Sequence, residues 1–142
     1  MSKVAISTAI EAKLNENAGS GKTLSVVYAE HKVDTDTYPM ATFEPSDIES
    51  DYETTSTDLR KYAFRIMIHQ QFKSITKTEA ISRVNSAEDA IIQSFGEAYT
   101  LGGVVDMLKI KPSVCGSYDK GNIPIYFSEL VIECLESVDI TS

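Results

Sequence analysis

The sequence predicts an α+β protein, a single domain over 1–142 in which two flanking α-helices pack on a mainly antiparallel β-sheet. Three observations predict this class. A chain of 142 residues fits one domain. Two segments have the apolar spacing of amphipathic helices. The segments with strand character mostly follow one another without a helical crossover, which favours antiparallel pairing. The expected elements are a helix over 3–17, strands over 24–33, 38–44 and 60–72, a helix over 77–99 and a strand hairpin over 104–138.

The first helix follows from the spacing of its apolar residues. Ile6, Ile10 and Leu14 recur every four positions, so they share one helical face. Asn17 and Gly19 supply the stop.

Two strands are expected next. The first begins with β-branched and aromatic residues from Leu24 and continues to Val33. The second covers 38–44, where the Tyr38-Pro39 pair favours an edge position. The residues 46–58 are polar and acidic, which predicts a loop or an exposed hairpin.

The strand over 60–72 has the clearest alternation, and one of its faces is expected to meet the core. The residues of that face are Tyr62, Phe64, Ile66 and Ile68. The opposite face includes Arg65 and His69 and is semi-polar. We expect a helix or a neighbouring subunit to cover it.

The second helix has the strongest local signals. Thr76 and Glu79 fit a capping box, in which the hydroxyl and the carboxylate each accept from a backbone amide. Gly102 and Gly103 end the unit. The apolar stripe consists of Ile81, Val84, Ala87, Ile91 and Phe95.

The C-terminal hairpin is expected to consist of a strand over 104–112, a turn over 117–122 and a long strand over 123–138. In the last strand the apolar residues change from odd to even positions. A bulge or bend near Ser128 would account for that change.

The charge is unevenly distributed. Thirteen Lys and Arg against twenty-one Asp and Glu give a net charge of −8. Between Lys32 and Arg60 there is no basic residue, and outside this segment acids and bases balance. Such a patch repels phosphate backbones, so we expect no specific nucleic-acid partner there. The segment also lacks the spacing of an EF-hand calcium-binding loop, with its central glycine and terminal glutamate. The acids of the segment are Asp34, Asp36, Glu44, Asp47, Glu49, Asp51, Glu53 and Asp58.

The segment 19–23 (GSGKT) resembles a phosphate-binding loop but fails its pattern, because Glu16 stands where glycine is required. Its context is also reversed, since a helix precedes it and a strand follows. The chain has no nucleophile elbow, zinc-protease helix or dinucleotide fingerprint.

The remaining reactive residue types predict no catalytic, cofactor or metal site. Cys115 and Cys134 have no CxxC spacing and are expected to be two free thiols, with Cys134 buried. His31 and His69 have no second ligand nearby in the sequence. No apolar run has the length of a membrane span or a signal peptide, so the expected compartment is cytosolic.

The order of elements as a whole resembles the tail-terminator (tail-completion, minor tail) proteins of long-tailed bacteriophages. The likeness rests on the early helix and strand pair, the alternating strand at 62–68, the capped helix at 80–95, the transition at 101–106 and the closing hairpin that ends with 130–134. The resemblance implies a structural protein with no enzymatic activity or cofactor.

Tail terminators form a ring, usually a homohexamer, on the head-proximal end of the tail tube. The resemblance therefore implies a location in the virion after synthesis in the bacterial cytoplasm, with DNA passing through the ring. Its partners would be further copies of the chain, the tail tube protein and a head or neck connector. No membrane partner is expected.

Exposed acids and loop aromatics are the residues we expect at such contacts. Tyr52 and Tyr118 are both expected in loops. The interface candidates are Asp47, Glu49, Asp51, Tyr52, Glu53, Tyr118, Asp119 and Lys120. The acidic segment would suit a ring face or the ring lumen.

Two alternatives stay open. A tail-tube or neck protein of the same structural family would share these elements and would polymerise or sit on the portal. A small ligand-binding or catalytic α+β domain would use His31, His69 or an acidic cluster, and it predicts a discrete pocket.

Overall fold

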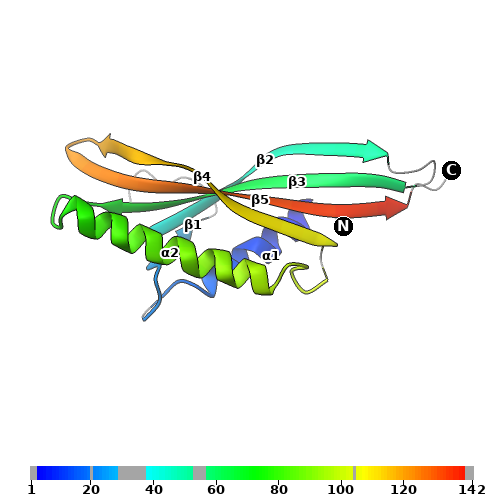
Figure 1. The fold of residues 1–142 in the computed structure, drawn as a ribbon, viewed down its shortest axis with the longest axis horizontal. Helices are drawn as coiled ribbons and strands as arrows, with labels where there is room; N and C mark the ends of the chain where they lie inside the picture. The colour runs from blue at the N-terminus through cyan, green and yellow to red at the C-terminus, as the bar shows by residue number, and fades with distance from the viewer. Residues whose placement is uncertain (1–2, 20, 29–37, 53–56, 104, 140–142) are drawn as a thin grey trace.

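The computed structural model describes residues 3–19, 21–28, 38–52, 57–103 and 105–139. Two helices and five strands form one elongated unit (Figure 1). Their bounds are α1 Lys3–Asn15, β1 Val26–Tyr28, β2 Met40–Tyr52, β3 Thr57–Gln71, α2 Lys77–Glu97, β4 Met107–Lys120 and β5 Ile123–Asp139.

The five strands form a single sheet in the order β1-β2-β3-β5-β4. The short β1 pairs in parallel with β2, and every other pairing is antiparallel. Both helices lie on the same side of the sheet (Figure 1). The predicted α+β class, with a mainly antiparallel sheet and two helices, is therefore confirmed.

The core lies between the helices and one face of the sheet. The predicted residues of α1, Ile6, Ile10 and Leu14, are all fully buried. The even positions of β3 meet them, as the alternation predicts, with Phe64 and Ile66 fully buried.

The apolar stripe of α2 differs from the prediction at one position. Ala80 is fully buried, whereas Ile81 is half-buried. A spacing of four residues before Val84 places position 80, not 81, directly on the buried stripe. The buried residues of α2 are Ala80, Val84, Ala87, Ile91 and Phe95.

The capping of α2 is confirmed in its first half. Thr76 has extended backbone angles, and its hydroxyl accepts from the backbone N–H of Glu79 at 3.1 Å. The Glu79 carboxylate accepts from Arg83 Nη2 at 2.8 Å. The helix ends at Glu97, before the predicted residue 99.

Three strand predictions need correction or extension. Strand β2 continues through the polar residues 46–52, which form a hairpin arm with β3, one of the two forms expected there.

The turn predicted over 117–122 is shorter in the structure. Gly121 and Asn122 form the turn, but 117–120 belong to β4. Gly121 has a φ of +63°, which favours glycine at the first position of a two-residue turn. The strand expected over 24–33 covers Val26–Tyr28, and 29–33 lie outside the described residues.

The predicted bulge lies on the neighbouring strand. Strand β5 pairs with every residue of β3 without interruption through Ser128. The register shifts instead on β4 between Pro112 and Cys115, which oppose Leu130 and Ser128. Because proline cannot donate to the sheet, an irregularity beside Pro112 costs less than one inside β5.

The second face of the sheet is buried at one end and polar at the other. Met40, His69 and Ile125 are almost completely buried there. Further along the same face, Arg65 forms an ion pair with Glu44 at 2.9 Å. The semi-polar character expected for this face is thus confined to part of it.

Candidate assembly surface

Strands β2, β3 and β5 continue beyond the first residue of β4, Met107, as a projecting arm (Figure 1). We define the arm as residues 46–52 of β2, 57–62 of β3 and 134–139 of β5. Backbone pairing joins β2 to β3 along the outer part of the arm, from Ile48 opposite Tyr62 to Tyr52 opposite Asp58. Long paired strands outside a helical layer give a protein a large surface for contacts with another chain.

The sheet has an open edge on each side. Strand β1 covers β2 only over Met40 to Thr42, so residues 43–52 have no outer partner strand in the described part of the chain. On the other side, β4 is the outermost described strand along its whole length. An unpaired edge presents a row of backbone donors and acceptors to another strand.

The first half of β4 carries features that discourage indiscriminate strand pairing. Lys109 and Lys111 are exposed, Pro112 has no N–H, and the bulge follows at once. The second half, from Cys115 to Lys120, is regular. The part of this edge that is open to pairing with a neighbouring strand is therefore the stretch from Cys115 to Lys120.

The predicted interface residues fall into two groups that the structure does not bring together. Asp47, Glu49, Asp51 and Tyr52 belong to β2 in the arm, and Glu53 lies outside the described residues. Tyr118, Asp119 and Lys120 end β4, at the opposite end of the sheet. Tyr52 and Tyr118 were expected in loops, but both lie in strands, because pairing with β3 and β5 extends these segments.

Tyr118 belongs to a buried polar contact. Its hydroxyl lies 3.0 Å from His69 Nδ1, and Thr42 Oγ1 lies 3.4 Å from His69 Nε2. The rings of Tyr118 and His69 meet edge-on, with centroids 5.9 Å apart. Burial, and then the nearby Tyr38, raises the pKa of Tyr118 to about 12. His69 thus connects three strands, while His31 lies outside the described residues.

A small pocket of about 220 Å³ lies between α2 and the β4 bulge. Ser128 Oγ donates to Glu88 Oε2 at 2.8 Å in its wall. Burial, and then a hydrogen bond with Cys115, raises the pKa of Tyr126. No sequence signal predicts this contact, because Glu88 and Ser128 are 40 positions apart in the chain.

The two cysteines differ as expected. Neither is in a disulfide, Cys115 is exposed and Cys134 is buried. Burial raises the pKa of the Cys134 thiol to about 12. Cys134 therefore behaves as a small core residue.

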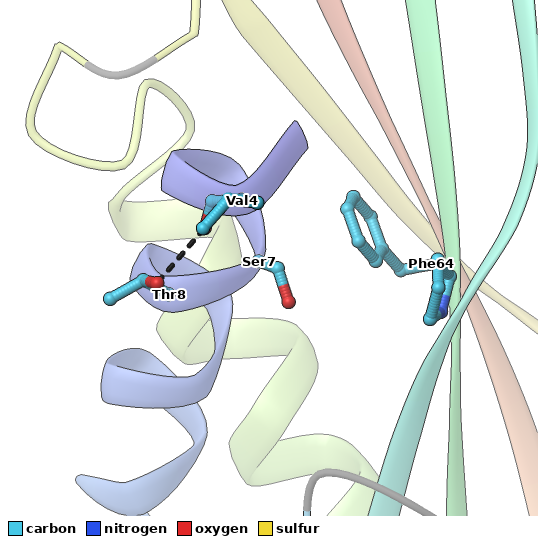
Figure 2. Close-up of a pocket in the computed structure, with 5 residues that line it drawn as sticks. Val4, Ser7, Thr8 and Phe64 are labelled. Atoms are coloured by element: carbon cyan, nitrogen blue, oxygen red, sulfur yellow. Dashed lines mark hydrogen bonds between the residues drawn. The ribbon is translucent and has the colours of Figure 1, made fainter. Parts of the chain in front are cut away.

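An apolar pocket of about 260 Å³ lies where the arm meets the helical layer (Figure 2). Val4, Ser7 and Thr8 of α1 line one side, and Pro45 and Phe64 of the sheet line the other. Thr8 Oγ1 donates to the Val4 carbonyl at 2.9 Å. Val4 is 74% exposed.

Other kinds of site were searched for in the described ranges. Among these residues, no group of three or more His, Cys, Asp or Glu side chains is placed to hold a metal ion. Within the same ranges, neither helix is long and apolar enough to span a bilayer.

Comparisons with known proteins add no family assignment. The chain matches no protein-family model, and no curated protein matches it significantly.

Proposed function

We propose that the chain is a structural protein that assembles with copies of itself into a ring, and that the ring caps the head-proximal end of a bacteriophage tail tube. In this role it ends tube polymerisation and presents the surface to which the head or neck joins. The proposal assigns no catalytic activity to the chain. Its partners would be the tail tube protein and a head or neck connector.

The observation that carries the proposal is the placement of contact surfaces at opposite ends of an elongated sheet. The arm lies at one end, and the last residues of β4 lie at the other. A contact between two different surfaces repeats from copy to copy and closes into a ring when the rotation permits. The open edges of β2 and β4 supply backbone hydrogen bonds for such contacts.

The choice of a terminator over a tube protein rests on the resemblance in element order. The edge-protecting residues Lys109, Lys111 and Pro112 agree with a limited assembly, because they restrict pairing along β4 to part of its length.

The buried position of His69 weighs against the catalytic alternative. Its two ring nitrogens lie against Tyr118 and Thr42, and the side chain is 0% exposed. A general base needs access to its substrate.

Light scattering on the purified protein over a concentration series tests the proposal. Six copies of the 15.6 kDa chain weigh about 94 kDa. We expect the measured mass to rise with protein concentration and to level off at this value, because a closed ring adds no further copies. Growth without limit would indicate a tube protein. A monomer at every concentration would contradict self-assembly in solution.

A further inference from the structure

A cleft of about 430 Å³ lies between the turn after α1 and the second turn of α2. Among the described residues, its walls carry two cations, Lys22 and Arg83, and no carboxylate. Hydroxyl groups make up most of the remaining polar lining. These hydroxyl-bearing residues are Thr23, Ser25, Tyr38, Ser82 and Ser86.

One of these hydroxyls is buried without a hydrogen bond. Thr23 Oγ1 has no partner among the described residues, whereas Ser25 Oγ donates to the Tyr38 carbonyl at 2.9 Å. An unsatisfied buried hydroxyl costs about 1–3 kcal/mol, so such groups are usually completed by water or a ligand.

The Arg83 side chain keeps donors for a ligand. Its Nη2 pairs with Glu79 Oε1 at 2.8 Å, which uses part of a guanidinium group that has five N–H donors. The cleft is therefore rich in donors, on a chain whose net charge is −8.

The segment Lys22-Thr23 is the one that fails as a nucleotide-binding loop, and the structure confirms that a helix precedes it. Its backbone closes a turn instead, with the Lys22 N–H donating to the Gly19 carbonyl at 3.2 Å. Lys22 and Thr23 nevertheless line the cleft together with Arg83 of α2.

We propose that this cleft binds the acidic arm of a second copy of the chain, through the carboxylates of Asp47, Glu49 and Asp51. The inference rests on the proposed function, since it names one contact of the ring. These three acids occupy alternate positions of β2, and the sequence between Lys32 and Arg60 has no basic residue. On the neighbouring strand of the arm, Lys61 lies opposite Glu49.

The placement of the two surfaces favours a head-to-tail contact. The cleft lies near the end of the sheet where β3 finishes, because α2 follows that end directly and Ser25 N donates to the Pro39 carbonyl beside β1. The arm projects from the opposite end (Figure 1). Each copy therefore offers an acidic arm at one end and a basic cleft at the other, and such contacts propagate around a ring.

Charge reversal in two separate variants tests the contact. The cleft variant carries Lys22→Glu and Arg83→Glu, and the arm variant carries Asp47→Lys, Glu49→Lys and Asp51→Lys. We expect each variant alone to need a concentration at least about tenfold higher to assemble. Mixed in equal amounts, they should recover assembly, because normal arms meet normal clefts and basic arms meet acidic clefts in alternation.

A matched control separates this contact from net charge. Lys73→Glu with Lys77→Glu makes the same charge change near the same end of the sheet, outside the cleft lining, and should assemble like the wild type. Arg83→Glu places a second carboxylate beside Glu79, and the resulting repulsion would destabilise α2. Arg83→Gln, with its fold checked by circular dichroism, tests the same contact without that repulsion. Its assembly midpoint should also rise.

The outcomes distinguish the two proposals. If the wild type assembles and the cleft variant or Arg83→Gln assembles equally well, the arm–cleft contact is wrong and the ring proposal stands. Failure of the mixture to recover also overturns the contact. If the folded wild type never assembles, the proposed function itself fails.

Discussion

The Tyr118 hydroxyl lies 3.0 Å from Nδ1 of His69, although β4 and β3 are separated by β5 in the sheet. The phenol therefore reaches across β5, where its ring also lies 5.9 Å from that of Phe127. Gly116 lies opposite Phe127 in the β4–β5 pairing, and an added Cβ there would only make ordinary contact with the Phe127 ring at 3.5 Å. This contact ties the edge strand to the centre of the sheet and holds the end of β4 in place.

Replacing Tyr118 by Phe should destabilise the fold without unfolding it. The change removes the hydroxyl that contacts His69 Nδ1, and the loss of a hydrogen bond to a buried group costs about 1–3 kcal/mol. Urea denaturation followed by circular dichroism measures this loss. The exposed Tyr99→Phe is the matched control and should change the free energy of unfolding by less than about 0.5 kcal/mol. Equal effects of the two changes would contradict a structural role for the Tyr118–His69 contact.

Stability should fall at high pH. Burial raises the pKa of Tyr118 from 10.0 to about 12 and that of Cys134 from 9.0 to about 12. The folded state therefore keeps both protons longer than the unfolded state does. The stability that these groups contribute is complete below pH 9 and is lost as the pH rises toward 12.

Urea midpoints measured between pH 8 and pH 12 test this dependence. The decline above pH 10 should be shallower in Tyr118→Phe, because that variant has no phenol to ionise there. A decline of the same slope in both proteins would show that Tyr118 does not contribute.

The two thiols should react at very different rates. Cys115 is exposed, whereas Cys134 is buried and its raised pKa lowers the thiolate fraction. A chromogenic disulfide reagent at pH 8 should label one thiol rapidly in the native protein and two in denaturant. The Cys115→Ser variant should lose the rapid phase. Rapid labelling of that variant would mean that Cys134 is accessible.

Two adjacent isoleucines on α2 provide a matched test of the core. Ile91 is fully buried and Ile92 is half-buried. Ile91→Ala should cost about 2–5 kcal/mol, because it creates a cavity between the helix and the sheet. Ile92→Ala should cost clearly less, since water reaches that side chain. Thermal unfolding measures both, and a larger loss at Ile92 would contradict the assigned helix face.

The features predictable from the sequence are those fixed by local periodicity. The spacing of Ile6, Ile10 and Leu14, the alternation in β3 and the Thr76 cap each depend on residues close in the chain. Their elements appear within a few residues of the expected bounds.

Features that depend on partners distant in the sequence were not predictable. The sequence of the polar half of β2 left a loop and an exposed hairpin open, and the hairpin forms because β3 supplies its hydrogen bonds. The same holds for residues 117–120 beside β5. The donor-rich cleft likewise joins Lys22 to Arg83, and no local pattern signals that meeting.

The central claim is that the chain closes into a ring, and electron microscopy of the purified protein at assembling concentrations tests it most directly. The account predicts closed rings one subunit thick, with an open centre and a uniform number of copies. Isolated single copies or open-ended tubes in place of rings would contradict it.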